Sequence, residues 1–263
     1  MDIRKLDTYN KSYLQGIERS SQFSYSTQYF WWKKYNTLEK IFCKIFKRCA
    51  AHKKKLRILD IGCQIGHDIF KLADKLKHEK IQFEWLGIDI NIDFIKVCNI
   101  RKKLRDDYQF CKFNFFVGNI EECSLKNEKF DIIICSEVFE HLHSDIKAIK
   151  NIHQLLNQDG VLILSTPNID NKAFKLSKFI GKKIIKNIHN TFKQAAKSEF
   201  EFCEKINISE KNDEHINLKK LKDWKKFIIE NNFKILSVKR GALFYGSKYI
   251  DNSLVLFIIV LFF

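Results

Sequence analysis

The sequence lacks the features that mark cross-linked, exported or membrane-spanning chains. Its eight cysteines include no C-x-x-C pair, which argues against a disulfide or zinc framework. Residues 1–7 contain no apolar core of a signal peptide. The C-terminal run 254–263 has ten apolar residues, too few for a membrane-spanning helix. We therefore expect a cytoplasmic protein whose thiols are reduced and mostly buried.

Proline is almost absent, with one in 263 residues, while Lys, Ile, Asn and Phe are abundant, as an AT-rich genome would produce. The formal net charge is +16. A charge of this size suits nucleic acid, an anionic membrane surface or an acidic substrate. The lysines are scattered, however, and form no dense tract. This favours compositional bias and makes nucleic acid the less favoured partner.

The C-terminal apolar run favours a strand, because it contains Val255, Ile258, Ile259 and Val260. We interpret it as the last strand of a sheet, buried on both faces. The alternative is a tail that touches a membrane surface, which would add peripheral membrane association to the cytoplasmic prediction.

The most informative stretch is 56–66, an apolar run that ends in Asp60 and enters a turn containing Gly62 and Gly66. A helical pattern follows the turn, with apolar residues on one face. Strand, glycine turn and helix begin a nucleotide-binding α/β unit, in which the helix N-terminus faces the ligand.

A second apolar strand, 83–89, ends in Asp89, which lies 23 residues after Gly66. In this topology an acidic residue at about that distance binds a ribose. A carboxylate suits a ribose because it can accept two hydroxyl protons at once. The alternative is that Asp89 caps a helix that starts near Asp93.

Strands and helices alternate from Leu56 onwards, which predicts an α/β fold with a mostly parallel sheet and helices on both faces. We expect residues 1–55 to form an N-terminal helical segment that packs on the core, and residues 56–263 to form the main domain. The seven expected strands lie near Ile58, Trp85, Phe115, Ile133, Leu162, Ile235 and Leu256.

A lysine-rich insertion at about 170–213 interrupts this alternation after the fifth strand. It follows the carboxyl end of the sheet, where ligands bind in such folds. We interpret it as a basic helical lid that shapes an acceptor pocket. The alternative is a solvated pair of amphipathic helices without ligand contact.

The turn Asp60-Ile61-Gly62-Cys63-Gln64-Ile65-Gly66 does not have the G-x-G-x-x-G spacing of dinucleotide sites. It resembles the D-x-G-x-G-x-G turn of the class I S-adenosylmethionine-dependent methyltransferases. Segments 117–121, 130–142, 159–168 and 213–217 resemble later segments of the same family in the same order. The resemblance extends from Leu56 to the C-terminus, which makes it more specific than any single motif.

Two residues depart from the family pattern. Gln64 stands where the family usually has its middle glycine, and we expect it to fit with a negative φ and an outward side chain. Asn119 stands where an aspartate is frequent, and it keeps an acceptor at the adenine edge while adding a donor.

The resemblance implies a Rossmann-like, seven-stranded sheet with an antiparallel last strand, and S-adenosylmethionine as the cofactor. It implies that Asp60 fixes the turn and reaches the amino group, and that Asp89 binds the ribose. The cofactor-binding residues it implies are Asp60, Gly62, Cys63, Gly66, Asp89, Asn119, Ile90 and Ile120 around the adenine, and Ser136 near the methionine moiety.

Methyl transfer requires an acceptor held in line with the sulfur–methyl bond and shielded from water. For a hydroxyl acceptor, His141 is the nearest candidate base in the sequence. Glu137, Glu140 and His141 are spaced so that they would share one face of a helix. His215 completes the candidate catalytic set, and the alternative for His141 is that it only orients the loop.

We therefore expect a methyltransferase that acts on a small-molecule, lipid-linked or sugar-like acceptor, and we assign no metal ligand. One alternative is an RNA 2′-O-methyltransferase of the 3′-end type, in which Glu137, Glu140, His141 and His215 would hold a divalent metal. The other is a degenerate, non-catalytic binding subunit, to which Gln64 and Asn119 point. The sequence does not fix the oligomeric state.

Overall fold

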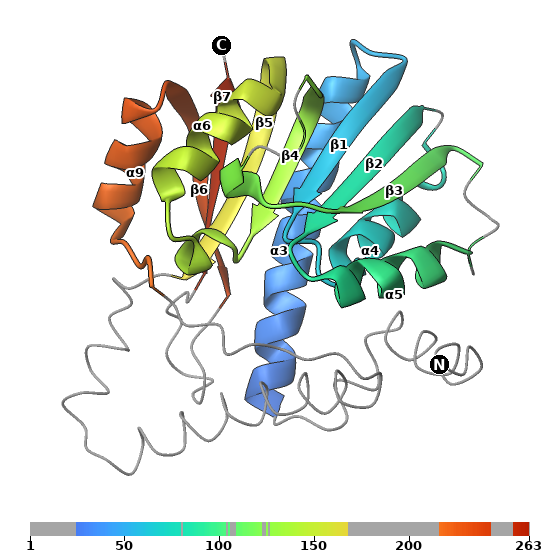
Figure 1. Ribbon diagram of the computed structural model, residues 1–263, viewed down its shortest axis with the longest axis horizontal. Coiled ribbons are helices and arrows are strands. Elements are labelled where there is room, and N and C mark those ends of the chain that lie inside the picture. The colour runs from blue at the N-terminus through green and yellow to red at the C-terminus, as the bar shows by residue number, and fades with distance from the viewer. Residues whose placement is uncertain are drawn as a thin grey trace.

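A computed structural model describes residues 25–79, 81–103, 105, 109–122, 125, 127–167, 216–242 and 255–262, with side chains between 34 and 239. Helices and strands alternate along most of this chain (Figure 1). The helices are α3 (Tyr25–Ala50), α4 (His67–Leu76), α5 (Ile92–Lys103), α6 (Asp145–Leu155) and α9 (Leu221–Glu230), with the short 3-10 helices η1 (Ile120–Glu122) and η2 (Phe139–His141). The strands are β1 (Lys55–Ile61), β2 (Gln82–Asp89), β3 (Cys111–Val117), β4 (Phe130–Ser136), β5 (Leu156–Pro167), β6 (Phe233–Ala242) and β7 (Val255–Phe262).

The strands form one sheet in the order β3-β2-β1-β4-β5-β7-β6. The first five strands are parallel, and β7 runs antiparallel to both of its neighbours. This confirms the predicted Rossmann-like parallel sheet. The strand order reverses at β1, which pairs with β2 on one side and β4 on the other. In such sheets the crevice at the carboxyl ends of these strands is the ligand site.

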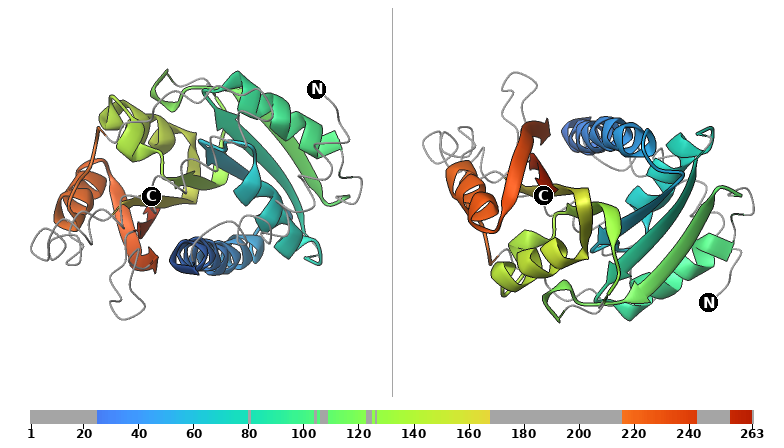
Figure 2. Two further views of the ribbon diagram at one scale, coloured as in Figure 1. Left: turned by 90° about the horizontal axis from the view of Figure 1, so that it is seen from below. Right: turned by 90° about the horizontal axis from the view of Figure 1, so that it is seen from above.

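Helices cover both faces of the sheet because its buried strands are apolar on both sides. Ile58 and Trp85 pack with α3, α4 and α5 on one face, whereas Leu59 and Leu86 join the cluster under α6 and α9 on the other. Figure 2 shows α3 and α6 on opposite sides of the sheet. This confirms the predicted helices on both faces.

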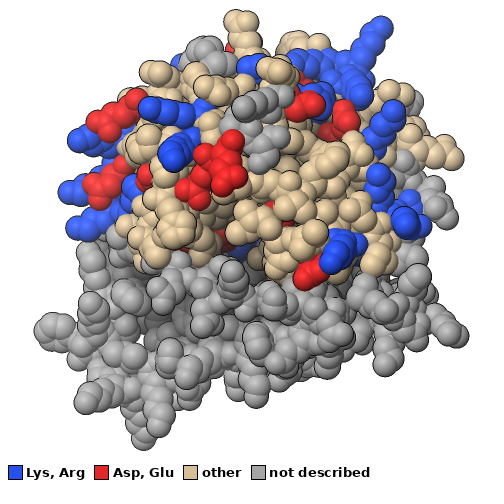
Figure 3. All heavy atoms as spheres, viewed as in Figure 1, with Lys and Arg blue, Asp and Glu red and all other residues tan. Residues whose placement is uncertain are grey.

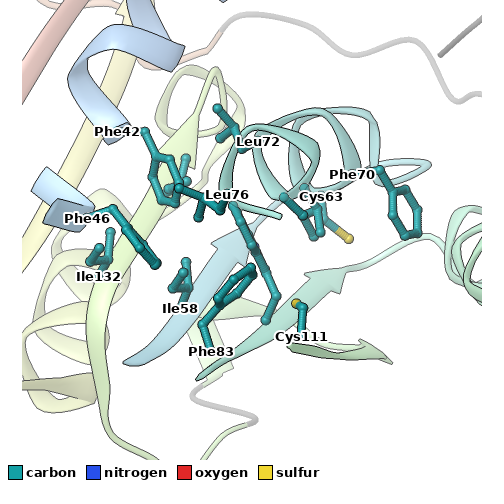
Figure 4. Close-up of a cluster of buried hydrophobic side chains, with 14 of the residues drawn as sticks. Phe42, Phe46, Ile58, Cys63, Phe70, Leu72, Leu76, Phe83, Cys111 and Ile132 are labelled. Atoms are coloured by element: carbon teal, nitrogen blue, oxygen red, sulfur yellow. The ribbon is translucent and has the colours of Figure 1, made fainter. Parts of the chain in front are cut away.

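Helix α3 packs on the core through one apolar face, as its helical spacing predicts. The Phe42 ring lies 5.2 Å from that of Trp85, and the Phe46 ring lies 5.5 Å from that of Phe83 (Figure 4). The N-terminal part of α3 projects past the carboxyl edge of the parallel strands (Figure 1). This helix therefore joins the core to the edge at which the ligand site is expected.

No helix in the described ranges is long and apolar enough to cross a membrane. On the face seen in Figure 3, Lys and Arg side chains are spread among Asp and Glu, in keeping with the scattered lysines of the sequence. The lid predicted at about 170–213 lies entirely outside the described residues, as do the side chains of β7. The lid and the two-sided burial of β7 therefore stay predictions.

Candidate functional site

The glycine turn after β1 is pinned against the neighbouring strand. The backbone N–H groups of Gly62 and Cys63 both donate to the carbonyl of Ile88, at 2.9 and 3.0 Å. Gly62 and Gly66 have φ values of +70° and +76°, in the left-handed region that favours glycine. A Cβ atom at Gly62 would lie 2.4 Å from Cγ2 of Val138. Only glycine therefore fits this turn without strain.

Gln64 adopts a φ of +46°, so the expected negative φ is wrong. Its backbone N–H donates to Oδ2 of Asp89 at 2.8 Å, and its carbonyl accepts from the thiol of Cys98 at 3.1 Å. A left-handed conformation is uncommon for a residue with a side chain. The charge-assisted bond to Asp89 offsets that cost by fixing the N–H in this direction.

Asp89 joins the glycine turn to the start of α5. Besides accepting from Gln64, its carboxylate accepts from the Asn91 N–H through Oδ1, at 2.9 Å. The side chain of Asn91 in turn accepts from the Asp93 N–H at 2.9 Å, so Asn91 caps α5 and the capping alternative for Asp89 is wrong. A carboxylate oxygen can accept more than one hydrogen bond, so these contacts are compatible with a ligand hydroxyl at the buried Asp89.

Asp60 is buried beneath the same turn, with 4% of its surface exposed. Burial, followed by Coulombic repulsion from Asp68 and Asp89, raises the pKa of the Asp60 carboxyl well above its ordinary value. Within the described part of the chain, both charges that act on it are negative. Three carboxyl groups therefore act on one another at the turn, an arrangement that suits a cationic ligand.

A polar row crosses the carboxyl ends of β4 and β5. Ser165 Oγ donates to Oε1 of Glu137 at 3.0 Å, and the Ser136 hydroxyl lies 2.9 Å from Ser165 Oγ. Glu137 has a φ of +56°, and its N–H donates to the carbonyl of Ser165 at 3.0 Å. A strained backbone of this kind occurs mostly at functional sites. The row thus fixes the Glu137 carboxylate at the edge of the crevice.

Lys34 of α3 faces the same carboxylate, with its Nζ 3.9 Å from Oε2 of Glu137. Only 7% of the Lys34 surface is exposed. The sequence analysis missed both Lys34 and Ser165. Neither has a local signal, because Lys34 lies in an amphipathic helix and Ser165 meets Ser136 only through the pairing of β4 with β5.

Sequence comparison identifies the family of this chain. The sequence profile of a family described as a methyltransferase domain matches residues 33–238, which is most of the chain. The chain belongs to the class I S-adenosylmethionine-dependent methyltransferases.

Curated relatives of this methyltransferase include the ubiquinone biosynthesis O-methyltransferases of Rickettsia akari and Pelagibacter ubique. The Rickettsia protein is 31% identical over 167 residues, which span 62% of each chain. The Pelagibacter protein is 28% identical over 218 residues, which cover 80% of this chain and 81% of the relative. The match to the Rickettsia relative thus leaves more than a third of that protein's length uncovered.

Solved structures share the fold at lower sequence identity. A methyltransferase from Clostridium acetobutylicum aligns with a TM-score of 0.54 and 14% identity, covering 87% of this chain and 92% of the other. The carbon methyltransferase of DszA aligns with a TM-score of 0.57 and 16% identity, covering 87% of this chain and 53% of the other. These similarities support the methyltransferase fold.

The structure places the three residues expected on the adenine side in different environments. Oδ1 of Asn119 accepts from the Glu121 N–H at 2.9 Å and so caps η1, and the role of Asn119 at the adenine edge stays a prediction. Ile120 is buried in the core cluster beneath α6, whereas 74% of Ile90 is exposed. Ile90 is therefore the residue of this pair that a ligand can cover.

A hollow of about 370 Å³ lies on the sheet face over β2 and β3. It reaches Ile88, Phe116 and Gly118, but its lining includes neither the glycine turn nor Asp60. The hollow exists because, among the described residues between β3 and β4, only the short helix η1 is present. It is therefore a separate feature from the crevice at the turn.

The expectation that Glu137, Glu140 and His141 share one helical face is wrong. Residues 139–141 form a 3-10 turn, and Glu137 precedes it with a left-handed backbone. Glu140 points into the core and is 1% exposed, while His141 is half-buried at the end of the turn. No cluster of three or more His, Cys, Asp or Glu suited to a metal occurs among the described residues. His215 lies outside them.

The buried Glu140 links the site to the segment that precedes α9. Its carbonyl accepts from the N–H groups of Ile216 and Asn217, at 2.8 and 3.0 Å. Burial, followed by repulsion from Glu137, raises the pKa of the Glu140 carboxyl to about 9. The carboxyl is therefore protonated at neutral pH.

We expect Glu140→Gln to stabilise the protein at pH 8. In the unfolded chain Glu140 ionises above its ordinary pKa of 4.5, whereas in the folded protein it stays protonated up to about 9. The wild type therefore loses stability as the pH rises through this window, and a neutral amide does not. The free energy of unfolding in urea should exceed that of the wild type by about 1–3 kcal/mol at pH 8, and by less at pH 5. Glu122→Gln, at an exposed position, is the control, and a gain that does not depend on pH would contradict the assignment.

Proposed function

We propose that this chain transfers a methyl group from S-adenosylmethionine to an oxygen of a small-molecule acceptor. The observation that carries the proposal is the convergence of Asp60, Asp68 and Asp89 at the glycine turn. S-adenosylmethionine carries two cationic groups, a sulfonium and an ammonium. Either cation, placed beside the three carboxylates, would offset the repulsion among those carboxylates. When bound, the cofactor supplies an electrophilic methyl group.

The residues around the turn divide the work of binding. The backbone at Gly62, Cys63 and Gly66 allows close approach, and Asp60 faces the positive end of the ligand. Asp89 binds the ribose hydroxyls while it holds Gln64 in place. We keep Ile90 and Asn119 on the adenine side and Ser136 on the methionine side as proposed contacts, whereas Ile120, which was expected to contact the adenine, is part of the core.

The Glu137 carboxylate is the proposed proton acceptor, because Ser165 fixes it at the end of β4. The cofactor would supply the methyl group and keep the sulfur as a neutral thioether, and the Glu137 carboxylate would take the hydroxyl proton of the acceptor. His141 and His215 remain the other proposed catalytic residues. Most of the acceleration would come from holding the acceptor in line and excluding water.

Two features support an oxygen acceptor on a small molecule. The curated relatives are named ubiquinone biosynthesis O-methyltransferases. The acid at the end of β4 suits removal of a hydroxyl proton.

We propose a lipid-linked or sugar-like acceptor as the finer assignment, with the lid at about 170–213 covering it and with peripheral membrane contact. In this proposal residues 1–55 support the site and residues 56–263 form the catalytic domain.

A non-catalytic binding subunit is the second candidate, because Gln64 occupies a left-handed position that glycine would fill without strain. Calorimetry with S-adenosylmethionine separates the two. Binding supports the enzyme, whereas undetectable binding at millimolar ligand supports the binding subunit. An RNA acceptor would instead give RNA binding that weakens steeply as salt is raised.

We expect Asp89→Ala to weaken cofactor binding by about 1.5–3 kcal/mol if the carboxylate accepts both ribose hydroxyls. The substitution also frees the N–H groups of Gln64 and Asn91, so the melting temperature should fall as well. Affinity is measured by calorimetry on protein shown to be folded. Asp93→Ala, at the start of α5, is the matched control. An affinity equal to that of the wild type would refute the role of Asp89.

A further inference from the structure

A lysine and two acidic residues meet where β4 ends. Lys34 Nζ forms an ion pair with Oε2 of Glu137. Burial and repulsion from Glu137 raise the pKa of the nearby Glu140 carboxyl, and the Lys34 charge opposes part of that rise. The next residue after Glu137, Val138, is the one that a Cβ at Gly62 would strike. The carboxylate that pairs with the lysine therefore belongs to the residue that precedes the one packed on the proposed cofactor turn.

The sequence resemblance to small-RNA methyltransferases implies a divalent metal held by Glu137, Glu140, His141 and His215. The described residues among these do not fit that role. Oε1 of Glu137 accepts from Ser165, and Oε2 faces the Lys34 ammonium. Glu140 and His141 do not converge with Glu137 into a group that suits a metal. A divalent cation needs several oxygen or nitrogen ligands, and an ammonium at this point repels it.

We propose that the Lys34 ammonium takes the place of a divalent cation, as a positive charge held against Glu137. This inference rests on the proposed function and extends it. A buried ammonium stabilises negative charge that develops on an acceptor oxygen. The acceptor class that follows is a hydroxyl acidic enough to ionise during transfer, such as a phenol. Helix α3 is then part of the acceptor site as well as of the core.

The test measures binding of Mn²⁺ to the full chain by electron paramagnetic resonance, after treatment with a chelator. Wild type and Glu137→Gln should bind Mn²⁺ equally weakly. Lys34→Met should bind it at least tenfold more tightly than the wild type, because the Glu137 carboxylate loses the ammonium that repels a metal cation. Adding Glu137→Gln to Lys34→Met should abolish that gain. Lys34→Arg should behave as the wild type.

Lys44→Met is the matched control, because Lys44 is an exposed lysine on the same helix. Two results would overturn the inference. In one, the wild type binds Mn²⁺ more tightly than Glu137→Gln does. In the other, Lys34→Met binds it no more tightly than Lys44→Met. If Lys34→Met fails to fold, as judged by circular dichroism, the comparison of wild type with Glu137→Gln decides alone. Calorimetry with S-adenosylmethionine tests the proposed function separately, so the two failures are distinguishable.

Discussion

The Gly62→Ala variant will unfold at a lower urea concentration than the wild type and will lose cofactor binding. Two costs add at this position. An L-residue with a φ of +70° loses about 1–2 kcal/mol, and a Cβ placed 2.4 Å from Cγ2 of Val138 forces repacking worth about 1–3 kcal/mol. The free energy of unfolding should therefore fall by about 2–5 kcal/mol. Urea titration followed by circular dichroism measures it.

Val138→Ala separates these two costs. Removing the Val138 methyl groups relieves the collision but leaves the left-handed backbone, so the double variant should recover only part of the lost stability. The four proteins of this cycle give the interaction free energy between Gly62 and Val138 directly. If the double variant loses as much free energy of unfolding as the two single variants together, the close approach of the turn to the end of β4 is wrong.

The parallel sheet and the glycine turn were predictable because their signals are local. Apolar runs that end in Asp60 and Asp89 determine two neighbouring strands, and Gly62 and Gly66 mark the turn between β1 and α4. Each signal lies within a few residues of the structure it specifies. The family resemblance then added the cofactor, which neither periodicity nor composition indicates.

The side-chain arrangement at the end of β4 was not predictable in the same way. The spacing of Glu137 and Glu140 suggests one face only if the backbone is an α-helix, and here it is a left-handed residue followed by a 3-10 turn. Lys34 reaches Glu137 from a helix about one hundred positions earlier in the chain. Such contacts depend on how the elements pack, which sequence spacing does not encode.

Gln64 shows how one contact overrides a local preference. A negative φ is the ordinary expectation for glutamine. The Asp89 carboxylate, brought alongside by the pairing of β1 with β2, holds the Gln64 N–H in the other conformation. The acid that the sequence assigned to a ribose therefore also shapes the turn, which is why its two roles must be tested together.

We expect Asp60→Asn to weaken S-adenosylmethionine binding by about 100-fold at pH 8. The amide keeps the size of the side chain but removes the negative charge that faces the cationic ligand. Loss of one member of a buried charge pair costs about 2–5 kcal/mol. Asp74→Asn, on the far part of α4, is the control for a general change in charge. Calorimetry measures both affinities.

The charge on Asp60 also makes wild-type binding depend on pH in a defined direction. The pKa of its carboxyl is raised in the free protein, and a bound cation favours the ionised form and lowers that pKa. Between the two pKa values binding releases a proton, so the affinity should rise as the pH rises, by up to about tenfold per pH unit. Any pH dependence of the affinity that comes from titration of the cofactor itself should remain in Asp60→Asn. Only the part that comes from Asp60 should disappear.

Asp68 provides the decisive comparison, because its charge helps to raise the pKa of Asp60. Asp68→Asn removes part of that repulsion, so the pH range over which affinity rises should move to lower pH. Calorimetry in two buffers of different ionisation enthalpy counts the protons released at each pH. If Asp60→Asn shows the same pH dependence as the wild type, Asp60 does not face the cation and the acidic turn does not select the cofactor by charge.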